Sequence, residues 1–171
     1  MDLHVPTTID ALAARRPAAT ALVQGSREMS WGELSGRTDR LAAVLVANGV
    51  GRRPEPAEHP WESPHDHVAL YLLNCPEYLE GMVGAWKAGA TSFNVNYRYV
   101  TDELAFLLDD ASTAAVVVHD RFADRLGQVL DRLARPPRLV LQVADGSGAP
   151  LLPGAVRYDD ALATADVGRL D

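Results

Sequence analysis

Cysteine and lysine are nearly absent from this sequence of 171 residues, which has one cysteine, Cys75, and one lysine, Lys87. A single cysteine excludes an intrachain disulfide and is compatible with a reducing compartment. Arginine carries the other 15 of the 16 basic charges, which we interpret as coding bias. Any chemistry that needs a lysine at a particular place therefore depends on Lys87.

Long apolar runs and an excess of basic residues are lacking as well. No apolar stretch approaches the roughly 20 residues that cross a bilayer, and the first residues lack the basic and apolar regions of a secretory signal. The formal net charge is -7, which disfavours nucleic acid and anionic membranes as partners. We therefore expect a soluble, cytoplasmic protein with no membrane span and no nucleic-acid partner.

What the sequence does contain is the pattern of an α/β protein. Its length fits one domain of ordinary size, and 47% of its residues are apolar. Four continuous apolar runs, separated by helical patterns, predict buried strands at Val68–Leu73, Thr91–Val95, Ala114–Val118 and Leu139–Val143. Such runs are typical of parallel strands covered on both sides. We predict a doubly wound, mostly parallel sheet with helices on both faces.

Several residues predict where helices begin and end. Thr7, Asn74 and Thr101 are candidate N-caps, and Ser30 with Glu33 has the spacing of a capping box. Gly49 and Gly89 each follow a helical pattern and predict left-handed C-terminal caps. A short strand is expected at residues 21–24 and a short helix at residues 159–165.

Residues 51–67 differ from the rest of the chain in composition. They include four prolines and show no hydrophobic period, which predicts an exposed loop whose charges have no evident partners. His59, His65 and His67 lie in or beside acidic surroundings, but nothing there sets the geometry of a metal site. We interpret the segment as a solvated loop, and the role of its Trp61 stays open.

No motif in the sequence carries catalysis by itself. A Gly-rich loop leading into Gly-Lys-Ser/Thr is absent, and no Gly-x-Gly-x-x-Gly follows a strand. Gly146-Ser-Gly148 is interpreted as a turn. His119 ends a strand, where active-site groups sit in open α/β sheets, yet a structural role is favoured. Cys75 begins a helix, where a thiol pKa can fall, but it lacks a neighbouring His and is interpreted as passive.

Three segments of the chain resemble elements of one enzyme family. They are Met29-Ser-Trp-Gly-Glu-Leu34, then Asn74-Cys-Pro-Glu-Tyr78 with Gly84-Ala-Trp-Lys-Ala-Gly-Ala90, then Asn94-Val-Asn-Tyr-Arg-Tyr-Val100 with Glu103-Leu104. The first two resemble shared elements of adenylate-forming enzymes, and the third looks like the acyl-CoA synthetase branch. Their order and spacing agree over roughly residues 3–145. The sequence is thus similar to AMP-binding acyl-CoA synthetases.

This resemblance implies a two-step ligase, in which ATP and magnesium activate a carboxylate as an acyl-adenylate and coenzyme A then displaces AMP. Family members are considerably longer, and their phosphate loop, ribose-binding Asp and adenylation lysine lie beyond the matched region. Lys87 belongs to a scaffold element and cannot replace that lysine. The resemblance therefore assigns no catalytic, cofactor-binding or metal residue here, and no cofactor to this chain alone.

The resemblance assigns only structural positions to this chain, which we call scaffold residues. Its positions are Trp31, Glu33, Leu34, Gly84, Lys87, Gly89, Asn94, Asn96 and Arg98. We interpret residues 1–171 as an incomplete N-terminal portion of an acyl-CoA synthetase, inactive alone. The alternative is a non-catalytic interaction or regulatory module on the same scaffold. In either case we expect self-association, or binding to a full-length synthetase or complementary chain. The acyl substrate stays undetermined.

Overall fold

The computed structural model describes residues 4–53, 59 and 62–169. Residues 54–58, 60 and 61 of the proline-rich segment, Trp61 among them, lie outside the described residues. The helices are α1 (Val5–Arg15), α2 (Trp31–Ala47), α3 (Pro76–Lys87), α4 (Thr101–Asp110), α5 (Ala123–Leu130) and α6 (Tyr158–Ala163), with 3-10 turns η1 (Asp120–Phe122) and η2 (Val167–Arg169). The strands are β1 (Thr20–Gln24), β2 (Arg27–Ser30), β3 (His67–Tyr71), β4 (Thr91–Asn94), β5 (Thr113–His119), β6 (Leu139–Val143) and β7 (Val156–Arg157).

The central sheet has the strand order β4-β3-β5-β6-β7, and every neighbouring pair is parallel. All four strands predicted from apolar runs are therefore confirmed, together with their parallel pairing. The fifth strand, β7, was not predicted. It has two residues and pairs with β6 through Leu141 and Gln142, and so short a segment leaves no hydrophobic pattern.

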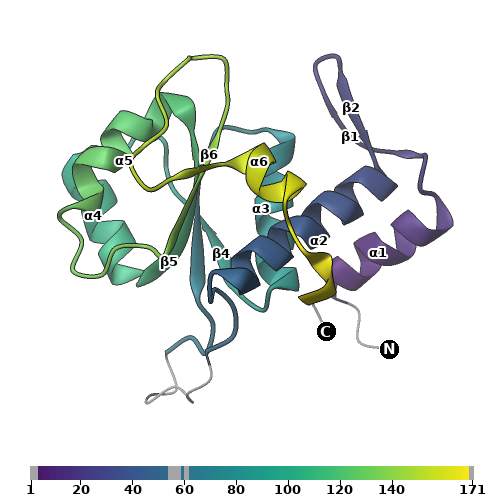
Figure 1. Cartoon of the computed structure of the whole chain (residues 1–171), viewed down its shortest axis with the longest axis horizontal. Coiled ribbons are helices and arrows are strands. Elements are labelled where there is room, and N and C mark those ends of the chain that lie inside the picture. Colours follow the sequence, from purple (N-terminus) through teal and green to yellow (C-terminus); the bar gives the residue numbers. More distant parts are fainter. Residues whose placement is uncertain (1–3, 54–58, 60–61, 170–171) are drawn as a thin grey trace.

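The chain winds across the sheet in two directions. From β3 it passes through α3 to the edge strand β4, and then crosses back through α4 to β5 on the other side of β3. Figure 1 shows α4 and α5 on one side of the sheet and α2, α3 and α6 on the other. Each side has its own apolar cluster. The predicted doubly wound fold is confirmed, and its winding reverses between β3 and β5.

The hairpin β1-β2 and helix α2 follow from local signals. The strands are antiparallel, and Gly25 at their turn has φ +60°. Ser30 Oγ accepts a hydrogen bond from the Glu33 amide at 3.2 Å, and Glu33 Oε2 accepts one from the Ser30 amide at 2.8 Å. The predicted capping box is therefore present. Gly49 and Gly89, at φ +69° and +75°, follow α2 and α3 as expected.

Three predicted N-caps are wrong by one to three residues. Helix α1 starts at Val5, so Thr7 lies inside it, and α4 starts at Thr101 itself. Helix α3 is capped by the extended backbone of Cys75 rather than by Asn74. In each case the helix begins without a side-chain cap at the preceding residue, and at α1 and α3 a proline occupies the first turn, where it has no amide to satisfy.

The expectation for residues 51–67 is wrong at the ends of the segment. Asp66 is buried, and its carboxylate accepts hydrogen bonds from the Gly51 amide, Arg53 and Arg138. A backbone bridge joins Arg52 to His65. The base of the loop is thus fixed to the sheet by paired charges, because a buried carboxylate requires partners.

A scaffold glycine from the resemblance has a clear packing reason. A Cβ atom at Gly84 would lie only 2.6 Å from the Leu41 side chain. Helices α2 and α3 therefore approach more closely than any larger residue at this position allows. Trp31 and Trp86 are half-buried against the apolar cluster that contains Leu34 and Val83, as expected for core residues.

Candidate functional site: the carboxyl edge of the sheet

The place where the winding reverses is the usual ligand position in open α/β sheets. There His119, the last residue of β5, faces the chain that leaves β3. Its Nδ1 accepts a hydrogen bond of 3.0 Å from the Leu73 amide. This bond places the proton of the neutral ring on Nε2.

The charge of His119 is set by its burial. Only 5% of the residue is exposed, and burial lowers the pKa of His119 below its usual value, although nearby Asp145 acts in the opposite direction. The ring is therefore neutral at pH 7. A neutral, hydrogen-bonded histidine at a strand end fits the structural role favoured from the sequence.

Aromatic side chains line the same edge. The rings of Tyr71 and Phe122 stack with centroids 4.7 Å apart, and Tyr97 lies parallel to Phe122 at 6.2 Å. Arg125 donates hydrogen bonds to the Tyr71 hydroxyl and to the carbonyls of Tyr97 and Tyr99. This arginine therefore holds the segment after β4 against α5. The sequence did not single out this aromatic group, because its members lie far apart in the chain.

The loop after β6 is also ordered by hydrogen bonds within the protein. Asp145 accepts from the amide and side chain of Arg121 and from the Ser147 amide. Burial alone would raise the pKa of Asp145, but these hydrogen bonds hold it well below the usual value. Gly146 and Gly148 have φ +80° and +73°, so the predicted turn at Gly146-Ser-Gly148 is confirmed.

A cluster of hydrogen-bonded polar side chains surrounds Gln142 of β6. The side chain of Gln142 donates to Asp120 at 2.7 Å and to the Pro150 carbonyl, and Arg157 also donates to Asp120. The side-chain oxygen of Gln142, Oε1, accepts a hydrogen bond from the Leu152 amide. The side-chain oxygen and nitrogen of Gln142 are thus both bonded within the protein, and the group ties residues 142–157 together.

ATP would have to bind at this edge through groups that these contacts leave free. A triphosphate needs backbone amides and cations that point toward open space. At this edge Arg121, Arg125 and Arg157 are each committed to protein acceptors. No Gly-rich loop follows any described strand at this edge except the turn at Gly146, whose Ser147 amide is bonded to Asp145. These three arginines and this turn therefore do not form a cradle for ATP.

Lys87 is not available for catalysis either. Its Nζ lies 2.6 Å from Asp10 Oδ1 and 2.6 Å from Asp39 Oδ1, and only 7% of the side chain is exposed. The lysine joins α1, α2 and α3 at the opposite end of α3 from the carboxyl edge. This agrees with its expected place in a scaffold element.

Cys75 behaves as a passive thiol. Burial, together with the nearby Glu77 carboxylate, raises the pKa of Cys75 to about 12. These effects outweigh its position at the start of α3, where a helix dipole favours the thiolate. At neutral pH the thiol therefore stays protonated.

The loop histidines do not meet as a metal site. His65 Nδ1 is bonded to the Gly89 carbonyl at 2.7 Å, and His67 Nδ1 is bonded to the Ala111 carbonyl. No group of three metal-ligating side chains occurs in the described part of the chain.

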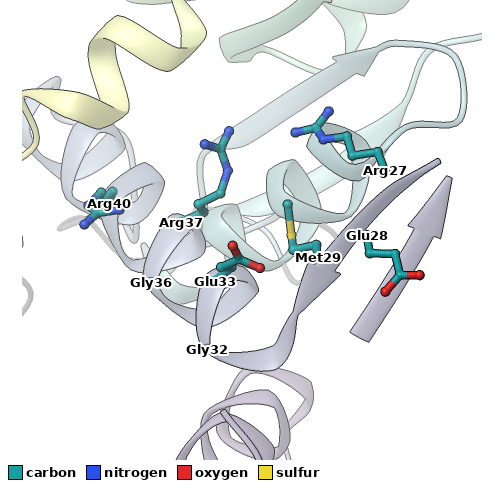
Figure 2. A pocket seen from close by; sticks show the side chains of 8 residues that line it. All are labelled: Arg27, Glu28, Met29, Gly32, Glu33, Gly36, Arg37 and Arg40. Atoms are coloured by element: carbon teal, nitrogen blue, oxygen red, sulfur yellow. The ribbon is translucent and has the colours of Figure 1, made fainter. Parts of the chain in front are cut away.

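A separate cleft lies between the hairpin and α2. Its volume is about 500 Å3, and Figure 2 shows Arg27, Arg37 and Arg40 around it with Glu28 and Glu33. Arg27 pairs with Glu77, and Arg37 pairs with both Glu80 and Asp159. Two of its three cations are therefore neutralised, which leaves Arg40 beside two carboxylates and no excess of positive charge.

None of the described helices is both long and apolar enough to cross a membrane.

Comparison with known sequences places these features in a family. The profile of the AMP-binding enzyme family matches residues 9–160. The medium-chain acyl-CoA ligase Mig of Mycobacterium avium is 40% identical over 94% of this chain, which corresponds to 29% of that protein. A medium/long-chain-fatty-acid–CoA/3-oxocholest-4-en-26-oate–CoA ligase of Mycobacterium marinum is 33% identical over 90% of this chain and 26% of its own length.

Solved structures show the same fold. An anthranilate CoA ligase, AuaEII, in complex with anthranoyl-AMP matches 96% of this chain and 29% of its own, with a TM-score of 0.80 and 19% identity. The N-terminal domain of FACL13 from Mycobacterium tuberculosis matches 97% of this chain and 37% of its own, with a TM-score of 0.71 and 23% identity. The chain thus spans less than a third of the length of its curated relatives. It belongs to the AMP-binding enzyme family and corresponds to the N-terminal portion of the acyl-CoA ligases in that family.

Proposed function

We propose that this chain supplies the N-terminal scaffold of an ATP-dependent acyl-CoA ligase and does not form acyl-adenylate by itself. The proposal is supported by the pairing of basic side chains with acceptors inside the protein. Lys87 is held between Asp10 and Asp39, and Arg121 and Arg125 at the carboxyl edge donate to protein acceptors. Adenylation depends on positioning and charge neutralisation of a triphosphate, and these cations already pair with acceptors inside the protein.

The remaining machinery would come from another ligase segment. ATP, magnesium, coenzyme A and a carboxylic acid are the reactants that membership of this branch supports, and the curated relatives' names point to medium- or long-chain acids. An apolar groove of about 350 Å3, lined by Ala43, Val44, Leu139 and Val156 among others, lies beside the edge strand β7. Val156 itself is 41% exposed. This surface suits a ligase segment that adds a strand to the sheet beside β7. A second copy of this chain is the alternative occupant of the groove.

The first experiment measures pyrophosphate release by the purified 171-residue chain. ATP, magnesium and fatty acids of increasing length are supplied, with and without coenzyme A, and we expect no rate above the blank. Turnover that disappears when a residue of this chain is substituted would contradict the proposal.

The second experiment supplies the missing part. The chain is co-expressed with the remainder of the Mycobacterium avium medium-chain ligase, and the mixture is examined by light scattering and by the same assay. We expect a stable one-to-one complex, and weaker association for Val156→Asp. A chain that stays monomeric alone and in the mixture would contradict the proposed partner.

A further inference from the structure

A cationic cleft lies at the amino edge of the sheet, opposite the carboxyl edge. It has a volume of about 460 Å3, and its polar lining consists of Arg52, Arg53, Asp66, Ser112, Thr113, Arg135 and Arg138. Four arginines therefore surround one carboxylate, in a chain whose formal net charge is -7. Its residues Arg52, Arg53 and Asp66 belong to the base of the proline-rich loop, where Arg52 and His65 form a backbone bridge.

Asp66 fixes two of the arginines but neutralises only one charge. Its carboxylate contacts Arg53 at 3.4 Å and Arg138 more closely, and it also accepts from the Gly51 amide. Arg52 forms no ion pair with any other described residue. The lining therefore keeps an excess of about three positive charges, because each guanidinium stays protonated at neutral pH.

Ser112 gives an independent indication that the cleft is specialised. It has φ +46°, and among the described residues it alone reaches positive φ without being glycine. Glycine would adopt this conformation without strain. The serine hydroxyl, however, accepts a hydrogen bond of 3.2 Å from Arg135 Nη2. The strained residue thus positions a cation at the cleft, and strained backbones cluster at ligand clamps.

From this geometry we propose that the amino-edge cleft binds a compact, multiply charged phosphate compound through Arg52, Arg135 and Arg138. Guanidinium groups form paired hydrogen bonds with phosphate oxygens, and the cleft volume is within the range of small-molecule sites. A long polyanion is disfavoured because acidic residues such as Asp109 lie just outside the lining, where Asp109 accepts from the Ala134 amide. The ligand class is a diphosphate, either free or attached to a nucleoside.

Titration calorimetry with the 171-residue chain tests this proposal at low ionic strength and at about 150 mM salt, where the Debye length is about 8 Å. Inorganic diphosphate and adenosine diphosphate are the two probes. We expect saturable binding at one site, weakened at the higher salt. Equal affinities assign the site to the diphosphate group alone, and tighter binding of the nucleotide assigns it to a nucleoside diphosphate. No saturable binding of either probe would overturn the proposal.

Variants separate this cleft from general charge effects. Arg135→Gln and Arg52→Gln should each weaken binding by about tenfold or more, because each removes charged hydrogen-bond donors. Arg40→Gln is the matched control, since it removes an exposed arginine from the other cleft (Figure 2). Ser112→Gly should weaken binding while the melting temperature stays equal or rises. A defined site would be contradicted if Arg40→Gln weakened binding as much as the cleft variants do. It would also be contradicted if neither Ser112→Gly nor Arg135→Gln changed the affinity. Neither result depends on ligase activity.

Discussion

The hydroxyl of Tyr158 donates a hydrogen bond of 2.8 Å to Glu80 Oε2, although 78 residues separate the two in sequence. Both side chains are buried, and Arg37 Nε donates to the other carboxylate oxygen at 2.8 Å. Burial, followed by the neighbouring Glu80 charge, raises the pKa of Tyr158 well above its usual value. The hydroxyl therefore remains a donor, and the contact fastens α6 to α2 and α3.

Tyr158→Phe should lower the free energy of unfolding by about 1–3 kcal/mol, because it leaves one oxygen of a buried carboxylate without a donor. Urea unfolding followed by circular dichroism measures the loss. Asp159→Asn is the control, since its side chain also contacts Arg37 but is 72% exposed, and such pairs contribute at most about 1 kcal/mol. Equal losses for the two variants would show that the buried contact is unimportant.

The single lysine makes amine labelling a residue-specific measurement. Lys87 should react with an acylating reagent far more slowly than the N-terminal amine of the same molecule, because its Nζ is buried between two carboxylates. Mass spectrometry of peptides gives both rates. Asp39→Asn should speed labelling of Lys87, whereas Asp131→Asn, distant on the exposed surface, should not. Comparable rates for lysine and N-terminus in the parent would contradict the buried pairing.

Alkylation should reveal the raised pKa of Cys75. With a pKa of about 12, its thiolate fraction at pH 8 is on the order of a thousandfold below that of an ordinary thiol near 8.5. Reaction with iodoacetamide should therefore be very slow in the folded chain and accelerate strongly in urea. The rate in the folded chain should still be rising above pH 9. A plateau near pH 9 would mean that the thiol is exposed and ordinary.

His119 predicts a loss of stability in mild acid. Its folded-state pKa is lowered by burial, so the unfolded chain binds a proton more readily, and stability falls as pH decreases through the unfolded value of about 6.5. One such group contributes a slope of at most about 1.4 kcal/mol per pH unit. Protonation at Nδ1 also breaks the hydrogen bond from Leu73.

The measurement is the free energy of unfolding between pH 5 and 7.5 for the parent and for His119→Asn, whose side chain can accept from Leu73 without titrating. The variant should show a shallower slope over this interval. Identical slopes would assign the acid sensitivity to other groups.

The central fold could be predicted because its strands are continuous apolar runs. Val116, Val117 and Val118 are all buried. A short continuous apolar run of this kind is typical of a strand that is covered on both faces of a parallel sheet. Strand β2 was missed because Arg27 and Glu28 are exposed and carry no apolar pattern. Gln142 interrupts an apolar run, yet its role depends on Asp120 and Arg157, which only the folded chain brings together.

The clefts could not be predicted for the same reason. Arg52 and Arg138 line one cleft in the folded chain but are distant in sequence, so no local sequence pattern connects them. Local signals were more informative where both partners were near neighbours, as in the Ser30–Glu33 capping box. Distant polar pairs have no comparable signature.

The packing of α2 has a consequence for synthesis of the chain. Its apolar face, with Leu41 and Leu45, contacts a cluster whose other members include Val68, Leu141 and Leu162, and all of these are translated later. While the ribosome completes the strands, that face has no native partner. We therefore expect nascent α2 to be a principal binding site for chaperones and the main source of aggregation during expression.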